Sequence, residues 1–131
     1  MIVVDANLIS YMLLQSEFTA LAEAVFNKDS HWIAPVLWRS EFRNVMCVYL
    51  KRKLITLESA KTAMEVAEAI ITAGEKVDSN VVLEAAVTLD LSAYDAEYYV
   101  TAKHYAVPLV THDKKLLKTD LAVSMEDFVR G

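Results

Sequence analysis

Short, wholly apolar runs alternate along this chain with longer amphipathic segments, and this alternation constrains the fold more than any other feature. Residues 1–4 (Met-Ile-Val-Val) and 107–110 (Val-Pro-Leu-Val) have the length and composition of buried strands. Residues 57–73 and 93–106 instead carry apolar side chains at helical spacing. Buried strands that alternate with amphipathic helices predict an α/β fold, in which helices cover both faces of a mostly parallel sheet.

Turn and capping residues place the boundaries of the expected elements. Pro35 suits the first turn of a helix, Thr56 is expected to cap the next helix, and Gly74 is expected to end it. The expected strands are residues 1–5, 31–34, 107–111 and 121–123, and a very short one that begins at Val77. The expected helices are residues 6–14, 17–28, 35–53, 57–73, 80–90, 93–106 and 125–130, with a single turn at 114–117.

The composition predicts one compact domain over residues 1–131. The hydrophobic fraction is 55% and the chain has only two glycines and two prolines, so disorder is not expected. No apolar run approaches the roughly 18 residues of a membrane span, and the N-terminus lacks the features of a secretory signal. The single Cys47 can form no internal disulfide, which suits a reducing cytoplasm. Its apolar neighbours predict a buried, inert thiol.

Four acidic residues stand in apolar surroundings, where carboxylates are least expected. Asp5 and Asp113 directly follow apolar strands, Glu41 flanks the apolar stripe of a helix, and Asp95 lies on the apolar face of another. Ligands of open α/β sheets bind beyond the carboxyl ends of the strands, where Asp5 and Asp113 are expected. Burying a carboxylate is costly unless it is paired, hydrogen-bonded or bound to metal. A cluster of such acids predicts a site for a hard divalent cation.

Each acid also has a structural explanation that the sequence leaves open. Asp5 and Asp113 can cap helices, and Glu41 can be a boundary residue with its stem on apolar surface. Ser92 to Asp95 matches a capping box at a helix N-terminus. These roles are compatible with a shared site, because a helix N-terminus stabilises negative charge.

Other residue patterns narrow the function further. At about 100° per residue, Asn44 shares the helix flank of Glu41, whereas Arg39 and Arg43 lie on the other side.

The histidines lack metal-ligand spacing, and no phosphate-binding glycine loop, dinucleotide fingerprint, zinc pattern or nucleophile elbow is present. The tyrosines and tryptophans fall mostly on apolar helical faces and are expected in the core. The net charge of −5 argues against a protein that passively coats nucleic acid, but not against an enzyme whose acids bind cations.

Four segments carry the acids together with polar neighbours. They are Val3-Val4-Asp5-Ala6-Asn7, Glu41-Phe42-Arg43-Asn44-Val45, Tyr94-Asp95-Ala96-Glu97-Tyr98-Tyr99 and Leu109-Val110-Thr111-His112-Asp113-Lys114-Lys115-Leu116. Taken in this order, they resemble the PIN domain, and most closely the VapC-type toxins. The likeness covers essentially the whole chain. It implies a three-layer α/β/α fold with a central, mostly parallel sheet of about four to five short strands.

The resemblance also implies an activity, that of a ribonuclease dependent on Mg²⁺ or Mn²⁺. The positions that match the family's acidic quartet are Asp5, Glu41, Asp95 and Asp113, and the supporting polar positions are Asn7, Asn44 and Thr111. We expect three of the acids (Asp5, Asp95, Asp113) to hold metal and the glutamate to complete the site. A metal-bound water, with its pKa lowered, would then attack the RNA phosphodiester in line. The candidates for contacts with the RNA backbone are Arg39, Arg43, Lys114 and Lys115.

Proteins of this type often form homodimers and are silenced by a small antitoxin protein, so the resemblance implies both partners.

Two other functions stay open. A phosphoaspartyl receiver domain has similar length and a parallel sheet, but it would want paired acids after its first strand, which has only Asp5. A PIN-fold binding or assembly module without significant nuclease activity would retain the acids, and metal binding without cleavage would favour it.

Overall fold

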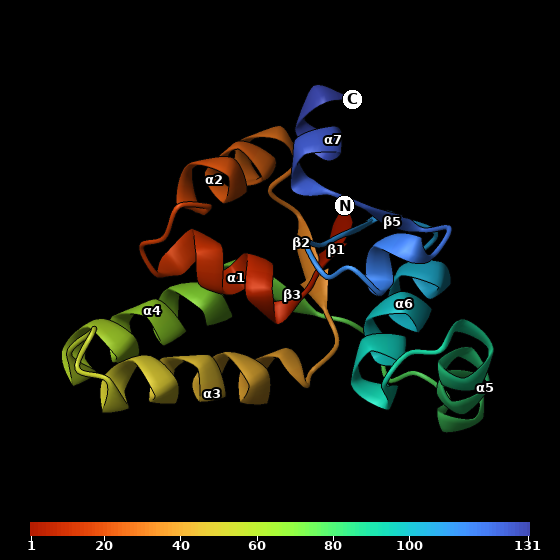
Figure 1. The fold of residues 1–131 in the computed structure, drawn as a ribbon, viewed down its shortest axis with the longest axis horizontal. Helices are drawn as coiled ribbons and strands as arrows, with labels where there is room; N and C mark the ends of the chain where they lie inside the picture. The colour runs from red at the N-terminus through yellow and green to blue at the C-terminus, as the bar shows by residue number, and fades with distance from the viewer.

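Five short strands form one sheet in which every neighbouring pair is parallel. The computed structural model describes residues 1–131 (Figure 1). The order of the strands in the sheet is β3-β2-β1-β4-β5. The strands are β1 (Ile2–Val4), β2 (Trp32–Ala34), β3 (Ile71–Ala73), β4 (Leu109–Val110) and β5 (Ala122–Val123). The helices are α1 (Ala6–Leu13), α2 (Thr19–Lys28), α3 (Trp38–Lys51), α4 (Leu57–Ile70), α5 (Ser79–Leu89), α6 (Ala93–Tyr105) and α7 (Met125–Arg130), with a 3-10 turn, η1 (Leu116–Lys118).

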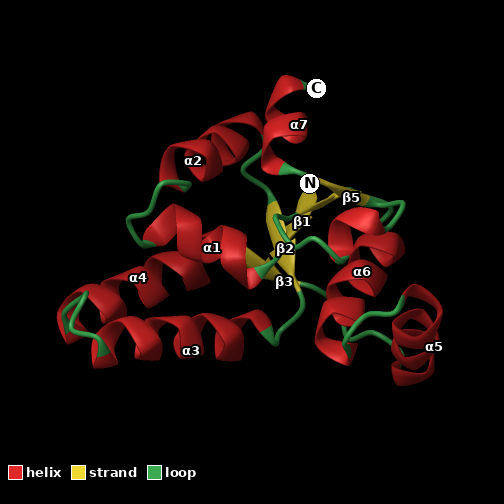
Figure 2. Cartoon of the chain, viewed as in Figure 1, coloured by secondary structure: helices red, strands yellow, loops and turns green.

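Helices cover the sheet on both sides. Figure 2 shows α1, α3 and α4 on one side of the strands and α5 and α6 on the other, while α7 packs against α2. The predicted three-layer α/β/α fold with a parallel sheet is therefore confirmed. No helix combines the length and the apolarity that a membrane span requires.

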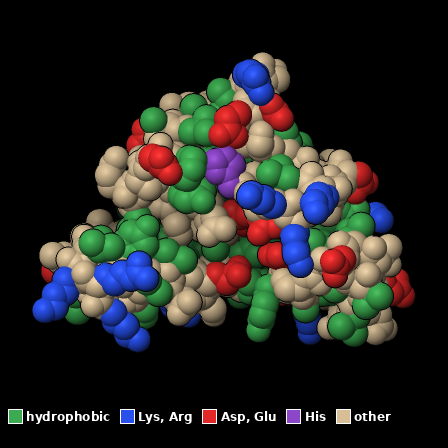
Figure 3. Space-filling model, in the orientation of Figure 1, with side chains coloured by type: hydrophobic (Ala, Val, Ile, Leu, Met, Phe, Trp, Pro, Cys, Tyr) green, Lys and Arg blue, Asp and Glu red, His purple; other side chains and the backbone are tan.

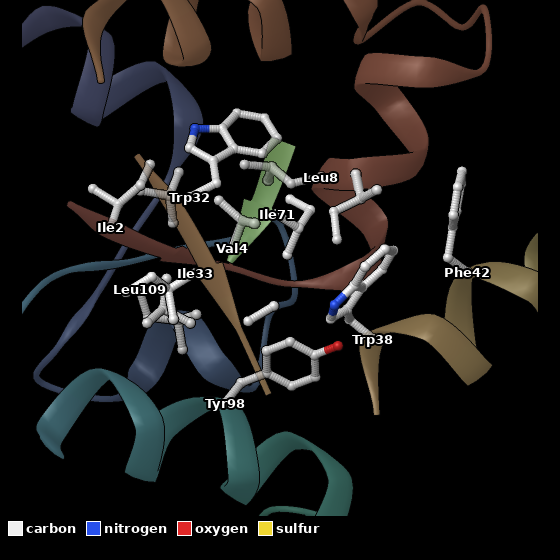
Figure 4. Packing of buried hydrophobic residues seen from close by; sticks show 14 of the residues in the cluster. Ile2, Val4, Leu8, Trp32, Ile33, Trp38, Phe42, Ile71, Tyr98 and Leu109 are labelled. Carbon is white, nitrogen blue, oxygen red and sulfur yellow. The ribbon is translucent and has the colours of Figure 1, made fainter. Parts of the chain in front are cut away.

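The apolar strands and one face of each covering helix make the core. All three residues of β1 and of β2 are buried, as expected for strands with a helical layer on each side. Helix α3 contributes Trp38, Phe42 and Met46, whose spacing of four residues places them on one helical face. In Figure 4, Trp38 and Trp32 lie on the α3 side of the sheet, and Tyr98 from α6 extends toward Trp38.

The structure differs from the sequence prediction at β3. The sequence predicts one helix over residues 57–73 and a strand beginning at Val77, but α4 ends at Ile70 and Ile71–Ala73 pairs with β2. Because β3 is an edge strand with only Ile71 buried, it has no apolar run or alternation to reveal it. Pairing with β2 overrides local propensity. The predicted cap of α4 is confirmed, since Thr56 and Ser59 form a reciprocal capping box.

Two smaller predictions in the α3 region are wrong. Pro35 precedes the helix: residues 35–37 form a turn, closed by the Trp38 amide donating to the Pro35 carbonyl at 2.9 Å, and α3 begins at Trp38. Cys47 is exposed rather than buried. It follows the buried Met46 by one residue, about 100° around the helix, so an apolar neighbourhood in sequence does not bury it.

The topology creates a switch point between β1 and β4. The chain proceeds outward from β1 to β2 and β3 and then returns to β4 on the other side of β1. In such sheets, the connections that follow the two central strands diverge and leave a crevice at their carboxyl ends. The residues that follow β1 and β4 are therefore the ones that the fold places at a candidate site.

Candidate active site

The strand register brings Asp5 and Thr111 together. Val4 pairs with Val110 across β1 and β4, and Asp5 and Thr111 are the next residues of the two strands. The Thr111 hydroxyl donates to one Asp5 carboxylate oxygen, while the other accepts from the Leu8 amide at 3.0 Å. Asp5 thus caps α1 and faces the switch point at once, so the two roles that the sequence left open coexist.

Asp113 is held by the loop that follows β4. Its amide donates to the Thr111 hydroxyl oxygen at 3.0 Å, and one of its carboxylate oxygens accepts from the Leu116 amide at 2.9 Å. Thr111, with no exposed surface, therefore connects the two aspartates. The bond to Leu116 confirms the turn-capping role and leaves the second carboxylate oxygen of Asp113 for the site.

Glu41 comes from α3 and meets a tyrosine from the opposite helical layer. The Tyr98 hydroxyl of α6 donates to Glu41 Oε1 at 2.6 Å. Asn44 lies one helical turn beyond Glu41 and lines the same cleft, as their shared flank predicts. The Tyr98–Glu41 hydrogen bond fixes the glutamate across the crevice between α3 and α6.

Asp95 lies in the first turn of α6. The Ser92 hydroxyl caps this helix by accepting from the Asp95 amide at 3.1 Å, so the capping half of the predicted box is present. The Asp95 side chain is half-buried and lines the cleft. A helix N-terminus stabilises this carboxylate through the positive end of its dipole.

All four predicted acids line one cleft of about 210 Å³. Its walls are Asp5, Ala6, Asn7, Glu41, Asn44, Val45, Asp95, Tyr98 and Asp113. In Figure 3, acidic side chains gather in the hollow between the helices on the left and α6 on the right. The catalytic and supporting residues predicted from the sequence are thus neighbours in space, with Thr111 buried beneath the cleft.

The electrostatics of the cleft disfavour so much negative charge. The pKa of Asp5 is raised to about 6, mainly by burial and also by the Asp113 and Asp95 charges, while hydrogen bonds from Thr111 and Leu8 act to lower it. A metal-free cleft is therefore partly protonated near neutral pH, as expected for clustered carboxylates.

Two other acids of the cleft, Glu41 and Asp95, also have a raised pKa, and burial is again the main cause. Burial raises the pKa of Glu41, as does Asp95, whereas the Tyr98 hydrogen bond lowers it. Burial and the Asp113 charge raise the pKa of Asp95, opposed by Ser92 and Lys115. Burial and the hydrogen bond to Glu41 raise the pKa of the Tyr98 phenol far above its ordinary value, so this hydroxyl is a hydrogen-bond donor at all physiological pH values.

The donor set of the cleft fits a hard divalent cation. Its side chains offer carboxylate, amide and phenol oxygens and neither sulfur nor imidazole nitrogen, and Mg²⁺ and similar ions prefer oxygen ligands. A cation would also relieve the repulsion among the acids. No group of three or more His, Cys, Asp or Glu side chains is spaced to hold one ion directly. Mg²⁺ usually keeps several waters and binds through one or two carboxylates, so this spacing is compatible with a hydrated ion.

The four basic residues predicted to contact RNA divide into two pairs. Lys114 and Lys115 are exposed on the loop after Asp113, and the Lys115 charge opposes the rise that burial causes in the pKa of Asp95. Arg39 and Arg43 are exposed on α3 but do not line the cleft. The lysines are therefore the better placed pair for a substrate that enters this cleft.

Sequence reasoning missed Tyr98, which it assigned to the core. The ring is buried, but its hydroxyl lines the cleft. The available signal was the spacing of three residues from Asp95, which places both side chains on one helical face. His112 does not line the cleft: it binds Glu126 at 3.2 Å and packs edge-on against Phe18.

The fold and the cleft together define a class: an α/β protein that presents clustered carboxylates at the switch point of a parallel sheet. A sequence profile of the PIN domain matches residues 2–121, and the chain belongs to the PIN domain family. PIN domains are in general nucleases and in general use divalent metal ions.

Comparison with solved structures agrees with this fold. The chain is similar to PAE2754 from Pyrobaculum aerophilum, known from its crystal structure, with a TM-score of 0.75 and 23% sequence identity. The similarity covers 98% of this chain and 93% of that one. At this identity it shows the shared fold alone. A search of curated proteins gives no significant match.

Proposed function

We propose that this protein is a Mg²⁺- or Mn²⁺-dependent endoribonuclease, of the VapC type, that hydrolyses RNA phosphodiester bonds. The observation that carries the proposal is the convergence of Asp5, Glu41, Asp95 and Asp113 on one cleft at the switch point. Local capping explains only the Asp5 and Asp113 carboxylates, which accept from the Leu8 and Leu116 amides, and it does not explain why Glu41 and Asp95 line the same cleft.

The three aspartates would hold a hydrated cation, some of them directly and the others through its water molecules. Asp5 and Asp113 are fixed by Thr111, and Asp95 is fixed by the start of α6. When bound, Mg²⁺ or Mn²⁺ would lower the pKa of a water molecule and neutralise charge on the scissile phosphate. Glu41 would orient the attacking water, because its second oxygen is left free by the Tyr98 bond.

The chain's own residues would also position the RNA. Lys114 and Lys115 would contact phosphates beside the cleft, giving a salt-dependent affinity. Asn7 and Asn44 line the cleft and would donate to phosphate or ribose oxygens. We further propose that the protein acts in the cytoplasm, forms a homodimer, and is silenced by a small antitoxin protein, as the resemblance to VapC-type toxins implies.

The alternative is a PIN-fold binding or assembly module without significant nuclease activity, which would retain the same acidic cleft. No three acidic side chains are spaced to hold one ion directly. An assembly module would not need its acidic side chains closer together. An enzyme would need the bound cation or substrate to draw these side chains to within metal-binding distance.

Cleavage assays separate these two functions. Purified protein would be incubated with a panel of tRNA, structured RNA and matched single-stranded DNA, in Mg²⁺, in Mn²⁺ and in EDTA. The proposal predicts metal-dependent RNA cleavage that leaves 3′-hydroxyl and 5′-phosphate ends. Folded protein that binds Mn²⁺ and cuts nothing in the panel would favour the binding module.

A further inference from the structure

A second hollow adjoins the catalytic cleft. It has a volume of about 260 Å³ and is lined by Leu37, Ser40, Glu41, Asn44 and Tyr94. Two of these residues, Glu41 and Asn44, also line the acidic cleft. A nucleotide whose phosphate lay in the cleft would therefore have this hollow beside it, with no intervening element.

Tyr94 is far more exposed to solvent than the tyrosines of the core. Its side chain is 66% exposed, and it is the only aromatic among the large exposed hydrophobic residues. Most tyrosines lie in or against the core, as the sequence predicts, but Tyr94 sits one residue before Asp95 at the start of α6 and is an exception. It also lines a neighbouring hollow of about 250 Å³. Its ring therefore borders open space in two hollows and does not serve to fill the core.

The remaining walls suit a nucleobase. Leu37 offers apolar surface, while Ser40 and Asn44 are exposed and carry hydrogen-bonding groups of both kinds. Proteins recognise unpaired bases by stacking them on aromatic rings and bonding their polar edges. A duplex presents its bases already stacked and paired, so it cannot use such a hollow without distortion.

The geometry points to a nucleobase subsite in this hollow, in which Tyr94 stacks on an unpaired base next to the scissile phosphate. The inference rests on the proposed nuclease function and adds to it a base-binding role for Tyr94 and the hollow that it lines. Tyr94 is a binding residue here, because it contacts the substrate and not the reacting atoms.

Binding measurements with matched oligomers test the subsite. A fluorescent oligoadenylate and an abasic ribose-phosphate oligomer of equal length would be titrated in Ca²⁺, with gels to verify that no cleavage occurs. Stacking on an aromatic ring changes affinity by about 5- to 150-fold. Tyr94→Leu is expected to weaken oligoadenylate binding by this factor and to leave abasic binding unchanged. Tyr94→Phe retains the ring and is expected to bind as the wild type does.

Leu54→Ala is the matched control, since Leu54 is 64% exposed but follows the far end of α3. It should change neither titration. Equal losses of Tyr94→Leu on both oligomers would overturn the subsite, and so would unchanged oligoadenylate binding. Wild-type protein that cuts no RNA in Mg²⁺ would refute the proposed function itself. If the wild type cuts RNA but Tyr94→Leu binds oligoadenylate as tightly as the wild type does, only the subsite is refuted.

Discussion

Replacing Asp5 by asparagine should stabilise the metal-free protein at pH 8, although it removes a residue of the candidate site. The pKa of Asp5 is raised from its ordinary 3.8 to about 6, chiefly by burial and in smaller part by the charges of Asp113 and Asp95. Ionisation of this carboxyl therefore opposes folding. Asparagine keeps the cap on α1, because asparagine and aspartate are comparable N-cap residues.

The size and sign of the effect follow from the two pKa values. Below pH 3.8 the Asp5 carboxyl is protonated in both the folded and the unfolded protein, so ionisation contributes nothing to stability. Between pH 3.8 and about 6 the unfolded chain ionises first, and the folded protein loses stability as the pH rises. Above that window the loss is complete, at most about 3 kcal/mol for a difference of about two pKa units. The substitution removes this loss.

Urea unfolding in EDTA at pH 4 and pH 8 measures the effect. The gain in unfolding free energy of Asp5→Asn over wild type should be larger at pH 8 than at pH 4 by about 2.5 kcal/mol, because the unfolded carboxyl is already more than half ionised at pH 4. The altered bond to Thr111 adds an offset that does not depend on pH over this range. Asp78→Asn is the control, because Asp78 is an exposed N-cap that accepts from the Asn80 amide at 2.8 Å. If the gain of Asp5→Asn were the same at both pH values, the electrostatic account of the cleft would be wrong.

Three further substitutions test the supporting contacts. Tyr98→Phe removes the hydrogen bond to the cleft glutamate and should lower Mn²⁺ affinity, measured by calorimetry, by about 10- to 100-fold, while Tyr99→Phe, whose hydroxyl binds Asp120 outside the cleft, should not. Thr111→Val should lower the unfolding free energy by about 1–3 kcal/mol, because it leaves buried polar groups without partners. Urea unfolding of Thr111→Val measures this loss, and a loss below about 0.5 kcal/mol would contradict it. Lys115→Ala should weaken RNA binding and reduce the salt slope of log K by about one, and an unchanged slope would remove this lysine from the substrate path.

The most predictable site residues were those whose charge conflicts with apolar neighbours in the sequence. Asp5 and Asp95 stand where a carboxylate is costly, so their sequence context alone marks them for a shared cleft. The parallel sheet was predictable for a related reason, since β1 and β4 are apolar runs that only burial explains. In each case the sequence departs from what an exposed segment would contain.

The features that the sequence concealed depend on contacts between distant segments. Residues 71–73 become a strand only because β2 offers an edge for pairing. Tyr98 acts in the cleft because Glu41, 57 residues away, meets its hydroxyl. The exposure of Cys47 depends on which face of α3 packs inward. The helical periodicity of the sequence locates the buried face of α3 with an uncertainty of about one residue. Cys47, which follows the buried Met46, lies at the edge of this face and is exposed.

The most direct test of the central claim is to compare RNA cleavage by the wild type, Asp95→Asn and Asp78→Asn in Mg²⁺ under single-turnover conditions. Both substitutions neutralise one acid in the first turn or cap of a helix, but only Asp95 lines the cleft. The account predicts that Asp95→Asn stays folded and loses at least about 100-fold in rate, while Asp78→Asn cuts as the wild type does. Cleavage by Asp95→Asn at the wild-type rate would show that the acidic cleft is not the active site.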